Sequence, residues 1–138
     1  MTTLFKKLIL VLIPAITMTF AAQANTSPET VPGATTVDSA QAKQLFDDGA
    51  LFVDVRKTTD WDAGRIPDAL HLDIKSAFSK EALSAEAAAN ESIVIYCNGH
   101  SCLRSSDASK MAVAWGFSKI YYYRDGIPAW KNAGYPVE

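Results

Sequence analysis

Apolar runs of strand length alternate with amphipathic and polar stretches along most of this chain. Residues 51–55 and 93–96 are almost continuously apolar, and residues 120–123 are an isoleucine followed by three tyrosines. Short continuous apolar runs are typical of strands that are buried on both faces, and aromatic residues favour strands. A shorter segment at residues 69–72 is a further candidate. We therefore expect several strands, separated by helices and loops.

Segments with helix signals lie between the strand candidates. Asp38 or Ser39 can cap a helix that Gly49 stops, and Gly116 can stop a later one. Helices are accordingly expected at residues 39–46, 80–89, 105–115 and 128–132, with one helical turn at residues 59–62. Strands that alternate with helices favour a parallel sheet. The pattern predicts an α/β fold, with a mainly parallel sheet of about five strands and helices on both faces.

Residues 1–24 have the three parts of a secretory signal peptide. Lys6 and Lys7 supply the positive charge, residues 8–20 the apolar stretch, and Ala22 and Ala24 the cleavage signal. An uncleaved membrane anchor is the disfavoured alternative, because the apolar stretch is shorter than the roughly 20 residues that a membrane span needs. We expect an exported protein, periplasmic in a bacterium with two membranes and secreted otherwise.

The rest of the chain is expected to form one small domain. Residues 25–34 contain two prolines and a glycine and are interpreted as a flexible lead-in to a domain at residues 35–138. Without Lys6 and Lys7, 11 basic residues stand against 15 acidic ones, a net charge of −4. With no basic cluster, neither nucleic acid nor, after signal cleavage, a membrane surface is an expected partner. We expect a monomer.

Cys97 is the first candidate for chemistry. It directly follows the apolar run at residues 93–96, and a short loop separates it from the helix expected from about Ser105. In that position, backbone N–H groups and the positive end of the helix dipole would stabilise a thiolate. Because the thiolate is the reactive form of cysteine, we hypothesise a nucleophilic cysteine. The alternative is a buried, inert side chain.

Cys102 lies in the same loop, and export would place both cysteines in an oxidising compartment. A Cys97–Cys102 disulfide is therefore an alternative to a free catalytic thiol, although spacing alone does not decide between them. Cys102 could otherwise be a spectator, or a resolving thiol that attacks a persulfide or sulfenic acid on Cys97. The two cysteines and His100 do not make a convincing zinc set, so no metal is expected.

Four segments in chain order resemble motifs of the rhodanese homology domain. They are residues 51–56 (LFVDVR), 60–69 (DWDAGRIPDA), 95–99 (IYCNG) and 125–137 (DGIPAWKNAGYPV). The resemblance implies a rhodanese-like α/β fold and sulfurtransferase activity without a metal or organic cofactor. The donor would be a small anion such as thiosulfate, and Cys97 would carry the sulfur as a persulfide. The acceptor would be cyanide, a thiol or an exported protein.

The loop after Cys97 is expected to bind the anionic donor, because a ring of backbone N–H groups in small residues can hold an anion. Arginine and histidine side chains would add charge-assisted hydrogen bonds. The residues expected in this anion-binding loop are Asn98, Gly99, His100, Ser101, Cys102 and Arg104, with Asp54 and Arg56 as supporting residues.

The same loop departs from the family pattern, in which the sixth position is often Arg. Here the sixth position is Cys102, and the nearest arginine is Arg104. Either Cys102 occupies the arginine position or Arg104 folds back. The departure favours a rival function, a silent or redox module with a Cys97–Cys102 disulfide that acts in thiol–disulfide exchange or partner binding. Phosphatase or arsenate reductase chemistry is disfavoured, because Leu103 stands where those signatures need arginine.

Overall fold

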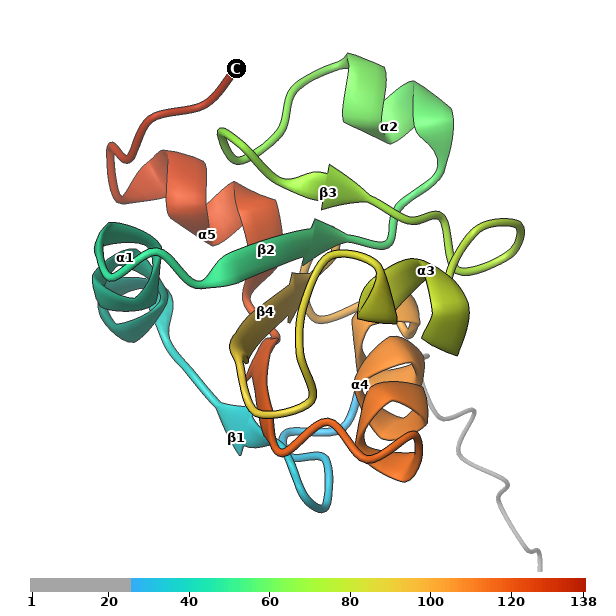
Figure 1. The fold of residues 1–138 in the computed structure, drawn as a ribbon. Helices are drawn as coiled ribbons and strands as arrows, with labels where there is room; N and C mark the ends of the chain where they lie inside the picture. The colour runs from blue at the N-terminus through green and yellow to red at the C-terminus, as the bar shows by residue number, and fades with distance from the viewer. Residues whose placement is uncertain (1–25) are drawn as a thin grey trace, which may run out of the picture.

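The computed structural model describes residues 26–138, which form one five-stranded sheet with helices on both faces (Figure 1). The strands are β1 (Thr35–Thr36), β2 (Leu51–Asp54), β3 (Leu70–His71), β4 (Ser92–Tyr96) and β5 (Lys119–Tyr123). Their order across the sheet is β1-β5-β4-β2-β3, and every neighbouring pair is parallel. The predicted signal peptide, residues 1–24, lies outside the described residues.

The helices of the described part are α1 (Ser39–Asp47), α2 (Thr58–Asp62), α3 (Lys80–Ser84), α4 (Arg104–Ala114) and α5 (Gly126–Asn132). Of the two predicted caps for α1, the one used is Asp38, whose carboxylate accepts the Gln41 backbone N–H. α1 and α5 pack on one face of the sheet, and α3 and α4 on the other (Figure 1). The predicted α/β fold, with a parallel sheet covered on both faces, is confirmed.

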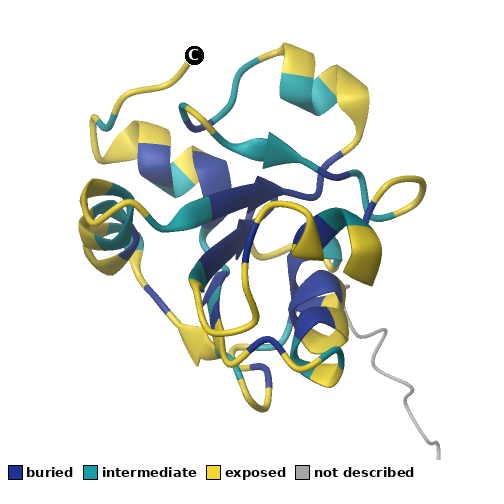
Figure 2. Cartoon of the chain, in the orientation of Figure 1, coloured by how far each residue is buried: buried dark blue, intermediate teal, exposed yellow. Residues whose placement is uncertain are grey.

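The two central strands carry core residues on both faces. Along β4, Ile93 and Ile95 join the cluster on the α3–α4 face, and Val94 and Tyr96 join the cluster on the α1–α5 face. This division follows from the alternation of side chains along a strand. Figure 2 shows the central strands as the most deeply buried part of the sheet. Burial on both faces is the reason why β2 and β4 are almost continuously apolar in sequence.

The helix predicted at residues 80–89 is shorter in the structure, where α3 ends at Ser84. Ala87 packs into the core, and the carbonyl of Ala89 accepts hydrogen bonds from the backbone N–H and hydroxyl of Ser118. These tertiary contacts override the helix propensity of an alanine-rich segment. The sequence also missed β1, whose two exposed residues pair with the edge of β5.

The segment interpreted as a flexible lead-in is packed against the domain over its described part, residues 26–34, so this interpretation is wrong there. Ser27 and Val31 are 2% and 1% exposed. The Arg124 guanidinium donates to the Ser27 carbonyl at 2.8 Å, and the Tyr122 hydroxyl donates to the carbonyl of the next residue at 2.9 Å. Side chains from β5 and the loop after it therefore hold a segment whose own sequence favours a loop.

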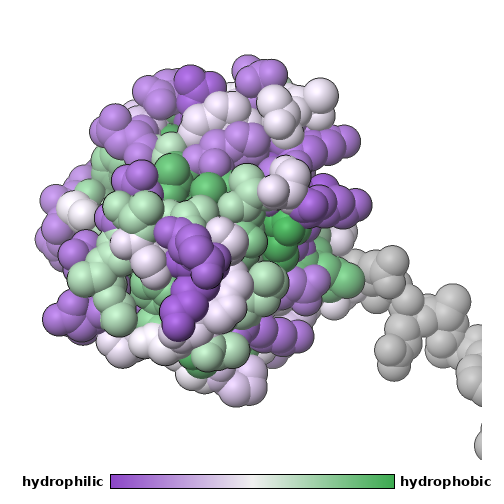
Figure 3. Space-filling view, turned by 45° about the vertical axis from the view of Figure 1, so that its right-hand side comes forward, coloured by the Kyte–Doolittle hydropathy of each residue, from purple (hydrophilic) through white to green (hydrophobic). Residues whose placement is uncertain are grey.

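Hydrophilic groups surround and interrupt the hydrophobic areas on the face shown in Figure 3. The large apolar side chains that are most exposed within residues 26–138 are Leu103, Met111 and Val137. Leu103 directly follows Cys102, so an apolar side chain stands at the rim of the cysteine loop. Among the described residues, none of the helices has the length and apolar character that crossing a membrane requires.

Candidate active site

A short loop, residues 97–103, connects the end of β4 to the start of α4. It lies at the carboxyl edge of the sheet, where Asp54 at the end of β2 is in register with Tyr96 at the end of β4. Ligands of parallel α/β sheets bind at this edge, because the loops that leave the strands meet there. Cys97 begins the loop, and Cys102 lies two residues before the start of α4. The topology therefore places both cysteines where such sheets gather functional groups.

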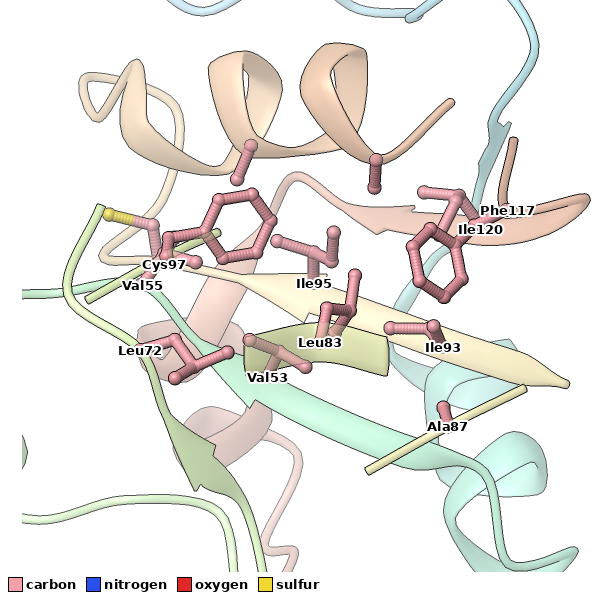
Figure 4. Packing of buried hydrophobic residues seen from close by; sticks show 13 residues of the cluster. Val53, Val55, Leu72, Leu83, Ala87, Ile93, Ile95, Cys97, Phe117 and Ile120 are labelled. Carbon is pink, nitrogen blue, oxygen red and sulfur yellow. The ribbon is translucent and has the colours of Figure 1, made fainter. Parts of the chain in front are cut away.

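The structure joins Cys97 and Cys102 in a disulfide bond, with 6.4 Å between their Cα atoms. Cys97 is 1% exposed and belongs to the core cluster on the α3–α4 face, whereas Cys102 is half-buried and packs against the same cluster. Figure 4 shows the Cys97 sulfur at the end of this row of core side chains, on the side where α4 begins. The accessible Cys97 thiolate favoured by the sequence is therefore not the state described here, because Cys102 is bonded to its sulfur.

Backbone contacts also fix the shape of the loop. Within the loop, the Cys102 N–H donates to the Gly99 carbonyl at 3.0 Å. At the start of the loop, the Ile127 N–H in α5 donates to the Cys97 carbonyl at 3.1 Å. These hydrogen bonds do not involve the sulfur atoms. The loop is thus held by main-chain contacts in addition to the disulfide.

Gly126, the first residue of α5, lies directly against the cysteine loop. Its φ is +67°, and a Cβ at this position would lie 2.4 Å from the Cys97 carbonyl oxygen and 2.7 Å from the Gly99 nitrogen. Both neighbours are backbone atoms, so the loop would have to move to relieve the clash. Glycine is therefore required for α5 to approach the loop this closely.

We expect Gly126→Ala to lower the free energy of unfolding by about 3 kcal/mol, from the left-handed φ and from overpacking. Gly49→Ala is the matched control, because Gly49 also has a positive φ, +85°, but a Cβ there meets nothing within 4 Å. The control should cost only about 1 kcal/mol. Urea unfolding of both variants measures the difference, and equal losses would contradict the role given to the close approach.

Asp54 and Arg56, expected as supporting residues, form a buried ion pair at the base of the loop. Their side chains are 0% and 4% exposed, and Arg56 Nη2 lies 2.6 Å from Asp54 Oδ2. Burial alone would lower the pKa of Arg56, but the hydrogen bond and charge of Asp54 more than offset it and raise the pKa. Arg56 also donates to the Gly64 carbonyl at 2.7 Å and to Asn98 Oδ1 at 3.2 Å. The pair thus links β2 to the cysteine loop.

Arg104, expected to bind an anion, is engaged with a carboxylate in the structure. Its Nη1 donates to Asp73 Oδ1 at 2.8 Å and to the Val55 carbonyl at 3.2 Å. The Lys75 backbone N–H has the largest effect and lowers the pKa of Asp73; burial opposes it, and the hydrogen bond and charge of Arg104 lower the pKa further, so that the net shift is downward. Asp73 was not among the residues predicted for the site. The sequence feature that could have indicated it is an acidic residue two positions after a short strand, at the carboxyl edge of the sheet.

His100, at the exposed tip of the loop, pairs with Asp125. Its Nε2 lies 2.5 Å from Asp125 Oδ1. The His100 carbonyl accepts the Ser27 backbone N–H at 2.7 Å, so the packed N-terminal segment also contacts the loop. Asp125 stands just before Gly126, and the start of α5 therefore holds the loop by a side chain as well as by backbone.

Three basic side chains in or beside the loop thus face a carboxylate, Arg56 with Asp54, Arg104 with Asp73, and His100 with Asp125. These pairs leave little net positive charge for a ligand. Backbone N–H groups are a different source of anion contacts. In the loop, the N–H groups of Asn98, Gly99, His100, Ser101 and Leu103 find no hydrogen-bond acceptor among residues 26–138. An anion in this loop would therefore be bound mainly by the main chain.

A cleft among the described residues lies away from the cysteines. Its volume is about 630 Å³, and its lining includes Leu51 and Ser92 at the opposite, amino ends of β2 and β4. Within residues 26–138 no group of three or more histidine, cysteine or acidic side chains could hold a metal ion. The cysteine loop is therefore the place where the described chain brings reactive and anion-binding groups together.

Comparison with known proteins gives consistent similarities. The family model of the rhodanese-like domain matches residues 38–133. The chain is 35% identical over 99 residues to the thiosulfate sulfurtransferase GlpE of Pseudomonas savastanoi pv. phaseolicola, covering 71% of this chain and 87% of that protein. It is 31% identical over 103 residues to a sulfurtransferase of Allochromatium vinosum, covering 73% and 92%. The human single-domain sulfurtransferase TSTD1 shares the fold alone, with a TM-score of 0.60, 24% identity, and coverage of 70% and 95%.

Proposed function

The chain belongs to the rhodanese-like domain family, and we propose that it moves a sulfane sulfur from a small anionic donor such as thiosulfate to a thiophilic acceptor, through a persulfide on Cys97. The observation that carries the proposal is the position of Cys97. It stands at the carboxyl end of the central strand β4, in a loop with unpaired backbone N–H groups, just before α4. The N-terminus of an eleven-residue helix favours negative charge nearby.

The reaction has two displacement steps at sulfur. The Cys97 thiolate attacks the outer, sulfane sulfur of thiosulfate, the sulfur–sulfur bond of thiosulfate breaks, and sulfite leaves with the electron pair. The product is a Cys97 persulfide. A thiolate or cyanide then attacks the terminal sulfur of this persulfide, and Cys97 leaves as thiolate. The backbone N–H groups of residues 98–101 stabilise the anionic reactants and products of each step.

This chemistry needs the disulfide to be reduced first, because the bond to Cys102 removes the nucleophile. A thiol reductant supplies the two electrons. We therefore expect the reduced, desalted protein to form thiocyanate from thiosulfate and cyanide, and the oxidised protein to form almost none. Absence of thiocyanate in both states, or equal rates in both, would contradict the proposal.

The disulfide itself favours a second candidate function, thiol–disulfide exchange. Cys102 is the more exposed of the two sulfur-bearing residues and is the one an external thiolate can reach. A reduced protein that takes up no sulfur from thiosulfate, yet reduces a model disulfide faster than Cys102→Ser does, would favour this alternative.

Export and a monomeric state complete the proposal. The signal-like residues 1–24 support export, to the periplasm in a bacterium with two membranes, and the acceptor would then be a small thiophile or an exported protein. N-terminal sequencing of the protein recovered outside the cytoplasm tests this, since it should begin at residue 25. A chain that still begins at Met1 would contradict it.

A further inference from the structure

We propose that Cys102 is a resolving thiol, which attacks the Cys97 persulfide, releases sulfide and leaves the Cys97–Cys102 disulfide. The domain then reduces a sulfane sulfur as well as transferring it. This inference rests on the proposed function, because that function supplies the persulfide. Four observations support it. They are the distance between the cysteines, the anchoring of the loop, the burial of Cys97, and the Cys97–Cys102 disulfide, which is the product that the proposed step would leave.

The backbone keeps the two cysteines within reach of each other. Their Cα atoms are 6.4 Å apart, inside the range of roughly 4.4–6.8 Å that disulfides span. The Cys102 N–H to Gly99 carbonyl bond curls the loop, and the Ile127 N–H anchors the Cys97 carbonyl. The packing of α5 against this loop leaves no room for even a Cβ on Gly126. These contacts survive reduction, so Cys102 remains beside Cys97 when the sulfurs are not bonded.

Burial decides which thiol reaches the inner sulfur of a persulfide. Cys97 is 1% exposed and its side chain lies among the core residues of the α3–α4 face. Cys102 packs against the same cluster and is partly exposed. The burial of Cys97 leaves almost none of its surface open to a thiol from solution. A thiol already in place also competes at an effective concentration of millimolar or higher.

The resolving step balances without any further reagent. The Cys102 thiol gives its proton to solvent, and its thiolate attacks Sγ of Cys97. A Cys102–Cys97 bond forms, the bond from Cys97 Sγ to the outer sulfur breaks, and this sulfur leaves as hydrosulfide with the electron pair. The two thiols are oxidised to a disulfide, and the sulfane sulfur is reduced by two electrons. The protein product is the state that the structure describes.

An external dithiol closes the cycle. Its thiolate attacks the sulfur of Cys102, the partly exposed residue, and Cys97, whose sulfur lies on the side where α4 begins, leaves as thiolate. A second attack within the dithiol frees Cys102 and oxidises the dithiol. Over one cycle, thiosulfate and a dithiol become sulfite, sulfide and a disulfide.

The test is a single turnover with no external thiol and no acceptor. The full-length mature protein is reduced, freed of reductant without oxygen, and mixed with thiosulfate, and then sulfide, free thiols and intact mass are measured. The wild type should release about one sulfide per chain and lose both thiols. Cys102→Ser should release no sulfide and keep one added sulfur on Cys97. Cys102→Ala repeats the test without a hydroxyl, and thiocyanate formation shows that each variant is folded and competent.

The outcomes separate this inference from the proposed function. A wild type that forms thiocyanate with cyanide, yet keeps its persulfide and releases no sulfide in the single turnover, would overturn the inference and leave sulfur transfer standing. Sulfide release from Cys102→Ser at the wild-type rate would also overturn it. If neither protein takes up sulfur or forms thiocyanate, the proposed function fails and the inference fails with it.

Discussion

Cys97→Ser should lower the rate of thiocyanate formation from thiosulfate and cyanide by on the order of a thousandfold or more, the scale on which nucleophile removal acts in other enzymes. A serine hydroxyl is a far weaker nucleophile than a thiolate, and it cannot hold the sulfur as a persulfide. The loop backbone and the buried Asp54–Arg56 pair remain in this variant. The loss should therefore appear in catalysis, in a steady-state assay of the reduced protein.

Cys102→Ser is the matched control for this experiment. Both variants lack the disulfide and carry the same substitution within one loop, so any general effect of losing the bond is common to both. Cys102→Ser keeps the sulfur-carrying residue and should retain transfer to cyanide. It should be active without prior reduction, since Cys97 has no partner in its own chain. Full activity in Cys97→Ser, or loss only in Cys102→Ser, would reject the assignment of Cys97 as the sulfur carrier.

Asp54→Asn is expected to lower the free energy of unfolding by about 3 kcal/mol. The substitution keeps the shape of the side chain but removes its charge, and it leaves the Arg56 guanidinium buried without a carboxylate. Removing one partner of a buried ion pair is costly because the other charge stays desolvated. Arg56 also holds Asn98 in the cysteine loop, so the sulfur-transfer rate should fall as well. Urea unfolding and the thiocyanate assay measure the two effects.

The exposed pair Lys43–Asp47 provides the control for this prediction. The two side chains are 28% and 52% exposed, and their atoms are 2.7 Å apart, nearly the same separation as in the buried pair. Asp47→Asn should cost only about 0.3–0.5 kcal/mol, because water and salt screen an exposed pair on a helix. Similar losses in the two variants would show that burial of Asp54 and Arg56 is not what makes their interaction matter.

The sequence predicts the centre of the fold better than its margins. The strands β2 and β4 are buried on both faces, so hydrophobicity alone marks them. β1 has only two residues, both exposed threonines, and exists through its pairing with β5. The alanine-rich end of the predicted helix at residues 80–89 unwinds where Ala87 packs into the core. Such margins depend on distant parts of the chain that a local pattern does not contain.

The candidate site likewise has parts that local sequence predicts and parts that depend on distant residues. The place of Cys97 follows from the end of a buried strand, which is a local signal, and the Asp54–Arg56 pair joins residues two apart in sequence. The partners of the loop come from far along the chain, such as Asp73 for Arg104. The state of the cysteines could not be predicted, because the sulfur–sulfur contact depends on how the loop curls.

The intact mass of reduced Cys102→Ser after incubation with thiosulfate tests the central claim most directly. In this variant the persulfide has no resolving thiol, so the bound sulfur should remain on the protein. We predict a gain of one sulfur atom that maps to Cys97, is removed by cyanide and is absent from the Cys97→Ser variant treated in the same way. An unchanged mass in folded, reduced Cys102→Ser would contradict the claim that Cys97 carries sulfur.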